Sequence, residues 1–149
     1  PVLSAHMFAF YFGIVADVTP PVALAAYAGA GISGANPLRT GVVAAKLAIA
    51  AFIVPYIFVL SPEILMINGT ASGILVATVT ALIGMWGISI AMIGYCIKNT
   101  NLVQRILFFF GGLLLIDPGT MTDVIGIAIL AAAYAWQKFE IKREAKAID

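Results

Sequence analysis

Long apolar runs separated by short polar turns are the dominant pattern of this 149-residue chain. A helix that crosses a bilayer needs about 20 consecutive apolar residues. Five apolar segments can be traced, the first of them interrupted at Asp17–Pro21: Val2–Ile32, Leu38–Leu60, Ala71–Ile97, Leu102–Ile116 and Val124–Phe139. The second and third are long enough, and the fourth is marginal, fitting a short span, a re-entrant piece or an interfacial helix. The pattern predicts an all-α, polytopic membrane helical bundle with one discontinuous helix broken by two prolines.

The connections carry residues that end helices or favour turns. They are Asn36-Pro37, Ser61-Pro62-Glu63, Lys98–Asn101 and Asp117-Pro118-Gly119. We expect three regions: 1–67 with the broken helix and one spanning helix, 68–137 with about three membrane helices, and 138–149 as a charged tail. Gly84 and Gly87 in the third segment predict close packing of helices, because small side chains let backbones approach.

Composition supports lipid as the solvent. Hydrophobic residues make up 62% of the chain and charged residues 10%, and the mean hydropathy is +1.07. A soluble domain carries roughly 25% charged residues, so this composition argues against a soluble enzyme. The net charge is +1, and the sequence has no basic stripe interleaved with aromatic residues. No nucleic-acid partner is therefore expected. Because Pro1 already opens an apolar stretch, we expect the natural protein to extend upstream, so that this chain is a fragment.

The basic residues predict an orientation, since loops rich in Lys and Arg stay in the cytoplasm. Arg39, the pair Lys98 and Arg105, and the tail then lie inside, whereas 61–70 and 117–123 hold no Lys or Arg and lie outside. This arrangement predicts a multi-pass inner-membrane protein with a cytoplasmic C-terminus, and it requires the fourth segment to cross. Lys46 is the exception, being either an anchor that snorkels to the interface or the partner of an ion pair with Asp17 or with upstream residues.

The interruption is the most informative stretch for function. Pro20 and Pro21 lack backbone N–H groups, so we expect the helix to end near Val18 and to restart at Pro21. Carbonyl oxygens left without partners at membrane depth cost several kcal/mol each. The negative end of the first half-helix suits a cation, and the N–H groups of the second suit an anion. Thr19 would add a hydroxyl oxygen to a Na⁺ site and Asp17 a full charge. The alternative is a proline kink whose Asp is buried and satisfied by a neighbouring helix.

Residues 10–27, Phe-Tyr-Phe-Gly-Ile-Val-Ala-Asp-Val-Thr-Pro-Pro-Val-Ala-Leu-Ala-Ala-Tyr, resemble the tripartite ATP-independent periplasmic (TRAP) transporters, particularly permeases with fused membrane subunits. Further matching stretches extend the resemblance over about residues 1–65: His6-Met7-Phe8, Gly31–Pro37, Thr40-Gly41, Lys46-Leu47 and Phe52–Val59. Residues after about Asn68 resemble the hydrophobic C-terminal extension of these fused permeases, where scaffolding or oligomer contact is the expected use.

The resemblance implies an elevator-type transporter that imports small organic anions, such as carboxylates, coupled to Na⁺ or H⁺. Its expected partners are an extracytoplasmic substrate-binding protein, the lipid bilayer and upstream permease helices, which would hold a second cation-binding interruption. No cofactor besides the coupling ion is implied. The site residues carried over are Thr19, Pro20, Pro21 and the backbone of Ala16 and Val18. Asp17 resembles the fused subgroup, whereas simpler large subunits often have a small residue there, so the choice between Na⁺ and H⁺ stays open.

The sequence offers few residues that would support an enzymatic function. An intramembrane aspartyl protease needs two membrane aspartates, and Asp17 is the single deep one; His6 has no second His at ligand spacing. No Gly-x-x-x-x-Gly-Lys loop for ATP is present. We therefore expect no enzyme, and the main alternative to a transporter is a non-transporting membrane scaffold or channel subunit.

Overall fold

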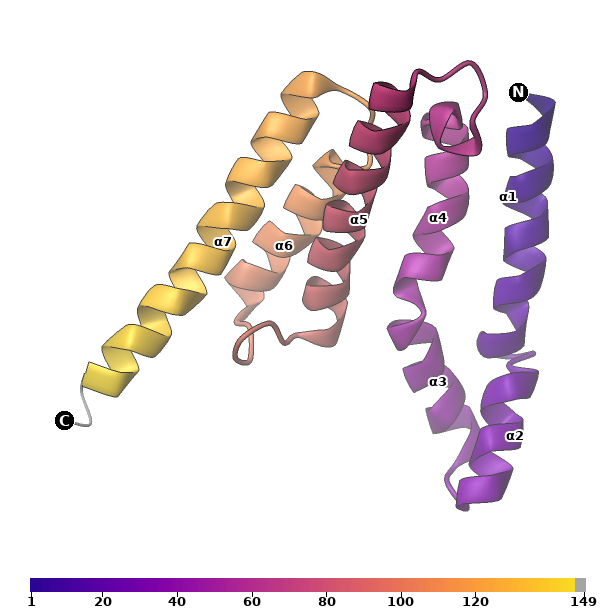
Figure 1. Cartoon of the computed structure of the whole chain (residues 1–149). Coiled ribbons are helices and arrows are strands. Elements are labelled where there is room, and N and C mark those ends of the chain that lie inside the picture. Colours follow the sequence, from indigo (N-terminus) through magenta and orange to yellow (C-terminus); the bar gives the residue numbers. More distant parts are fainter. Residues whose placement is uncertain (147–149) are drawn as a thin grey trace. The chain divides into compact units, whose positions relative to one another are not determined.

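The computed structural model describes residues 1–146, most of which lie in helices (Figure 1). The helices, with η marking a 3₁₀ helix, are α1 (Val2–Val15), η1 (Ala16–Val18), α2 (Leu24–Ser33), α3 (Pro37–Leu47), α4 (Ile49–Leu60), η2 (Pro62–Leu65), α5 (Ala71–Ile93), α6 (Leu102–Leu114) and α7 (Thr120–Lys146). The described residues hold no β-strand, only an isolated bridge between Tyr95 and Asn99. The all-α prediction is confirmed.

Two helices are long and apolar enough to cross a bilayer within the described range: α5, and Thr120–Arg143 of α7. The pair α3 and α4 passes the same test when taken together. The chain is thus a membrane protein with candidate membrane-spanning helices, as its composition predicts. At about 1.5 Å per residue, the 13 residues of α6 reach roughly 20 Å, less than the hydrocarbon thickness of about 30 Å.

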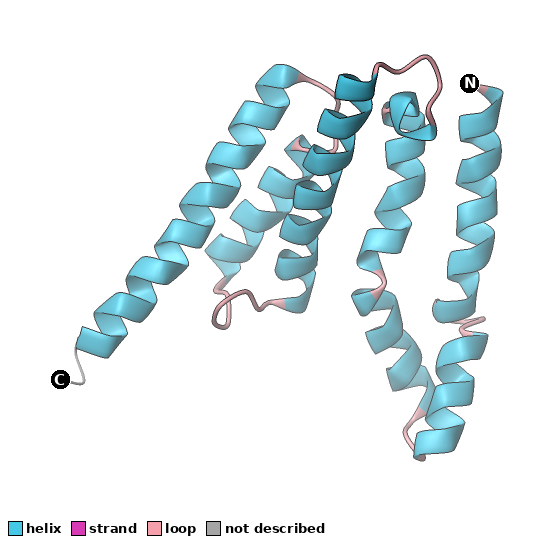
Figure 2. Ribbon diagram, viewed as in Figure 1, coloured by secondary structure: helices cyan, strands magenta, loops and turns pink. Residues whose placement is uncertain are grey.

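The chain divides into two compact units, residues 1–77 and 78–149, and the boundary falls inside α5. In the first unit α1 packs against α4 and α2 packs against α3, so that the chain descends through α1 and α2 and returns through α3 and α4 (Figure 1). Figure 2 shows a loop segment between α1 and α2 and another between α3 and α4. The expected regions 1–67, 68–137 and 138–149 stay a prediction, and residues 147–149 of the tail lie outside the described residues.

The interruption at Ala48 contradicts the expectation of one continuous helix over Leu38–Leu60. The two halves are bent by 43°. The N–H of Ala51 bonds to the Ala48 carbonyl three residues back, at 2.9 Å, which tightens the helix locally in place of the usual four-residue bond. Neither proline nor glycine stands at the break, so the local residues carried no signal for it.

The second unit contains α6, α7 and the part of α5 from Thr78 onward. Glycines hold its helices close together, since a Cβ at any of these positions would come within about 3 Å of a neighbouring helix: Gly84, Gly87, Gly111, Gly112 and Gly126. Gly84 and Gly112 meet backbone to backbone, because a Cβ on Gly112 would lie 2.6 Å from the Gly84 carbonyl oxygen. The packing role predicted for Gly84 and Gly87 is confirmed. The buried centre consists of Ile90, Ala91, Phe108, Leu115, Leu130 and Ala133.

Helix α5 ends at Ile93, four residues before the expected Ile97. Gly94 follows with a left-handed backbone (φ 81°), which glycine adopts at low cost. Arg105 of α6 then donates from Nε to the Ala91 carbonyl oxygen at 2.7 Å. Its positive charge thereby lies at the negative end of α5. At the other end of the unit, α7 begins at Thr120 rather than at Val124 and continues into the charged tail.

The predicted crossing by α6 can be tested with two cysteines, one in each of the loops that α6 joins. Asn99 and Met121 are both exposed, Met121 at 76%. We expect Met121→Cys to react with a membrane-impermeant maleimide added to intact cells, and Asn99→Cys to react only after permeabilisation. Burial raises the pKa of the native Cys96 thiol and slows its reaction, and Cys96→Ser removes its background altogether. Labelling of both cysteines from the same side would contradict a crossing by α6.

Candidate functional site

The first half of the broken helix ends close to the expected place. Regular α-helix stops at Val15, and η1 continues to Val18, before Thr19 turns to an extended backbone (φ −112°, ψ 124°). The Thr19 hydroxyl donates to the Val15 carbonyl oxygen at 2.7 Å, and its N–H donates to the Ala16 carbonyl oxygen at 3.1 Å. Thr19 therefore terminates the helix with both its side chain and its backbone.

The second half starts later than expected, at Leu24 rather than at Pro21. Residues 20–22 form a turn that includes a cis bond between Pro20 and Pro21. Ala23 is left-handed (φ 37°), and its N–H lies 2.9 Å from the Thr19 carbonyl oxygen and 3.2 Å from that of Ala16. The prediction of a restart at Pro21 is wrong because residues 20–22 form a turn and Ala23 is left-handed, so regular helical backbone begins only after Ala23.

The number of unpaired carbonyl oxygens is smaller than the sequence predicts. Those of Val15, Ala16 and Thr19 accept hydrogen bonds from inside the interruption. Among the residues that the structure describes, none donates to the carbonyl oxygens of Asp17 or Val18. The groups three and four residues after Asp17 are prolines and have no N–H to give. Two backbone oxygens thus accept no hydrogen bond, and they belong to the two residues that precede Thr19, whose hydroxyl proton is donated to Val15.

The remaining predicted site residues gather in the same short segment. Ala16, Val18, Thr19 and Pro20 are half-buried, whereas Asp17 and Pro21 are exposed in this chain. The alternative of a buried Asp satisfied by a neighbouring helix is not seen among the described residues. Nor is the ion pair considered for Asp17 and Lys46 present among the residues that the structure describes.

Gly41 of α3 is a site residue that reasoning from the prolines alone missed. A Cβ at this position would lie 3.0 Å from Pro20 Cγ and 3.1 Å from Tyr27 Cε1. Glycine therefore lets α3 pack directly on the interruption and on the start of α2. The signal in the sequence was a glycine inside an otherwise helical segment, which often marks a close approach of another element.

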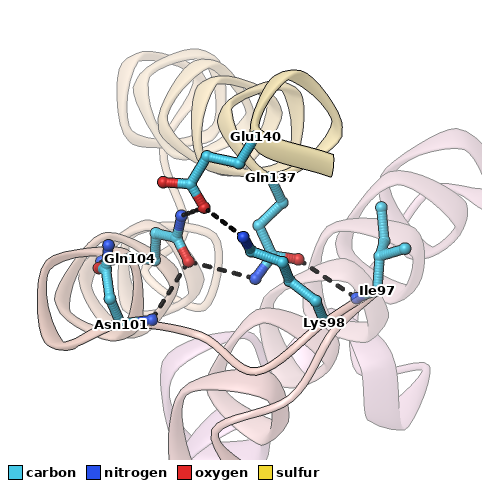
Figure 3. Close-up of polar contacts among 6 residues, drawn as sticks. All are labelled: Ile97, Lys98, Asn101, Gln104, Gln137 and Glu140. Carbon is cyan, nitrogen blue, oxygen red and sulfur yellow. Dashed lines mark hydrogen bonds and ion pairs between the residues drawn. The ribbon is translucent and has the colours of Figure 1, made fainter. Parts of the chain in front are cut away.

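A second polar cluster lies in the extension, where the sequence predicted few polar groups. It joins α6, α7 and the loop between α5 and α6 (Figure 3). Gln104 and Gln137 are fully buried, and the Gln137 Nε2 donates to the Gln104 Oε1 at 3.3 Å. Gln104 also donates to Glu140 at 3.2 Å, and Glu140 pairs with Lys98 at 3.1 Å. The Gln137 Oε1 accepts from the Ile97 N–H at 3.2 Å.

This cluster ties one end of the second unit together and is not an open binding site, because its members satisfy one another. Asn101 and Gln104 form a reciprocal cap at the start of α6, with the Gln104 N–H donating to Asn101 Oδ1 at 2.9 Å. The spacing Asn-x-x-Gln was a recognisable capping signal. The link to Gln137 and Glu140 on α7 depends on tertiary contact and had no local signal.

Replacing Gln137 with Leu should destabilise the second unit by about 1–3 kcal/mol, because the Ile97 N–H and the Gln104 side chain lose their buried partner. The measurement is thermal unfolding in detergent, followed by circular dichroism. In a double-mutant cycle with Gln104→Leu, the double variant should lose less than the sum of the single losses, since the two residues share a hydrogen bond. A Gln137→Leu protein as stable as the wild type would contradict the role assigned to the cluster.

The part of the chain that the structure describes contains no group of three or more His, Cys, Asp or Glu residues close enough together to hold a metal ion. The donors at the interruption are backbone and hydroxyl oxygens, which suit a hard monovalent cation better than a transition metal. The resemblance to TRAP permeases rests on the motif residues alone, because comparison of the chain with family models, curated proteins and solved structures finds no match.

Proposed function

We propose that the chain belongs to a secondary active transporter of the TRAP type, which imports small organic anions coupled to Na⁺ or H⁺. In this proposal the protein is a multi-pass inner-membrane permease with a cytoplasmic C-terminus and an elevator mechanism. It works with an extracytoplasmic substrate-binding protein and with upstream permease helices, and it needs no cofactor besides the coupling ion.

The observation that carries the proposal is that the carbonyl oxygens of Asp17 and Val18, the two residues before Thr19, accept no hydrogen bond among the described residues. Unpaired oxygens at membrane depth are tolerated where they line a cavity or bind a solute. Interrupted helices of secondary transporters coordinate coupling ions in this way. A cation at the end of η1 would gain both the oxygens and the negative end of the helix.

The restart at Leu24 supplies the complementary end. Ala23 offers no side-chain cap, so the first N–H groups of α2 are available to a carboxylate. Gly41 holds α3 against Pro20 and Tyr27, which fixes the two half-helices around the turn. In this proposal the interruption offers oxygens to a cation and N–H groups to an anion within a few residues of each other, so that the two solutes bind together.

The test is uptake of labelled dicarboxylates and related acids by the full-length protein in vesicles, together with its binding protein. We expect accumulation driven by an imposed Na⁺ or pH gradient and abolished when the gradient is collapsed. A scaffold gives no uptake under any gradient, and a channel subunit gives flux without accumulation. Either result would replace the proposal with the corresponding alternative.

A further inference from the structure

The second unit has an apolar groove on its surface between α5 and α7. Its volume is about 330 Å³, and its lining consists of Ile83, Trp86, Ile127, Leu130, Ala131 and Tyr134. The aromatic rings of Trp86 and Tyr134, both part of the lining, form a tilted pair with centroids 6.3 Å apart. Trp86 remains 48% exposed and Ile127 47%. The groove therefore presents a contiguous apolar surface that nothing in the second unit covers.

Positive charge lies at one end of this groove. The Lys138 Nζ lies 5.3 Å from the centre of the Tyr134 ring, so it contacts a residue of the lining directly. Lys142 follows one turn later on α7, and the spacing of four residues places Tyr134, Lys138 and Lys142 on one face of the helix. Both lysines are exposed. The neighbouring acid Glu140 is engaged with Lys98 and Gln104, so it does not neutralise them.

We propose that this groove binds an anionic phospholipid, with an acyl chain between α5 and α7 and the headgroup phosphate at Lys138 and Lys142. Lysines at the end of a membrane helix reach the interface, where they attract acidic headgroups. The inference rests on the membrane character of the chain and holds whether or not the chain transports anions.

A lipid fits this groove better than another helix does. Membrane helices pack through small residues that let backbones approach. The small residues of the second unit, such as Gly84, Gly87 and Gly126, are already packed against a neighbouring helix of that unit. The groove is lined instead mostly by large side chains, with Ala131 as the small exception. Lys138 and Lys142 follow Tyr134 on the same face of α7, and a helix would have to match these two cations with acids.

The test uses Trp86 as a reporter, because its ring lines the groove. The purified protein is reconstituted into vesicles containing equal amounts of phosphatidylcholine and phosphatidylglycerol, and only one of the two lipids carries brominated acyl chains, which quench tryptophan. Surface charge is thus the same in both samples. The contribution of Trp86 is the part of the quenching that Trp86→Phe removes.

We expect brominated phosphatidylglycerol to quench Trp86 more strongly than brominated phosphatidylcholine does. The preference is the ratio of Trp86 quenching by brominated phosphatidylglycerol to that by brominated phosphatidylcholine. The double change Lys138→Gln/Lys142→Gln should bring this ratio close to one, because each lysine contributes up to about fivefold to the affinity for the anionic lipid. Arg143→Gln is the matched control, since Arg143 is exposed at the same depth but lies about 100° around the helix from Lys142, and it should keep the preference.

Three results would overturn the proposal: equal quenching by the two lipids in the wild type, an equal loss of preference in Arg143→Gln, or no quenching of Trp86 by either lipid, which would mean that protein covers the groove. Unchanged quenching by phosphatidylcholine shows that the double variant keeps its groove. If it does not fold, Lys142→Gln alone, in the last described turns of α7, gives the same comparison against Arg143→Gln.

Discussion

Replacing Thr19 with Ala is expected to abolish cation-dependent uptake at ordinary ion concentrations. The change removes the hydroxyl oxygen that the proposal gives to the cation, and it also removes the 2.7 Å bond from Thr19 to the Val15 carbonyl oxygen. A bond to a charged group is worth about 1.5–3 kcal/mol, which corresponds to a rise of roughly 10- to 100-fold in the half-saturating cation concentration. The measurement is initial uptake rate against Na⁺ concentration and against pH in vesicles.

Thr19→Ser and Thr19→Val separate the hydroxyl from the shape of the side chain. Ser keeps the oxygen and should retain most of the uptake, whereas Val keeps the volume and should fail as Ala does. The variants should remain folded, as judged by expression and melting temperature in detergent. Unchanged uptake by Thr19→Ala would show that the hydroxyl at the interruption does not take part in cation binding.

Asp17→Asn then identifies the coupling ion. If protons drive uptake through this carboxyl group, the neutral amide cannot carry them, and uptake driven by a pH gradient should be lost. If Na⁺ binds to the backbone and Thr19 oxygens, the Asp17→Asn protein keeps the backbone carbonyl, and uptake driven by Na⁺ should persist with weaker apparent affinity. Loss of both activities in a folded protein would give Asp17 a role in each.

The largest effect on stability is expected for Gly112→Leu in the second unit. A Cβ at Gly112 would lie 2.6 Å from the Gly84 carbonyl oxygen and 2.8 Å from Ile88 Cγ1, so α5 and α6 must separate to admit any side chain. Overpacking typically costs about 1–3 kcal/mol, and sometimes more. Because the obstacle is backbone rather than a flexible side chain, we expect Gly112→Ala to fall in that range and Gly112→Leu to exceed it. Thermal unfolding in detergent and resistance to protease are the measurements.

Gly13→Ala is the matched control, because a Cβ at Gly13 meets nothing within 4 Å. Gly13 lies in the last turn of α1, ahead of η1, so alanine there should be neutral or stabilise by up to about 0.5–1 kcal/mol through its higher helix propensity. A Gly112→Leu protein that melts like the wild type would show that α5 and α6 do not meet backbone to backbone.

The sequence by itself determined the features that depend on composition or on covalent chemistry. An excess of apolar residues leaves lipid as the only suitable surroundings, so the membrane helices were predictable. Proline has no N–H wherever it stands, so the place where the first helix ends and the missing donors after Asp17 followed directly from two residues. The spacing Asn101-x-x-Gln104 is likewise a local capping pattern that indicates the start of α6.

Tertiary structure decided what depends on partners far away in the chain. The interruption at Ala48 had no local signal, and the glycine at position 41 marked a close approach without saying that Pro20 would be the neighbour. The same holds for the contact between Gly84 and Gly112 and for the bond between Gln104 and Gln137. In a soluble protein, a polar face opposite an apolar one indicates which side of each helix packs inward. Here lipid and protein interior are equally apolar, so helix packing is set by close backbone contact and hydrogen bonds, which appear only when the helices are brought together.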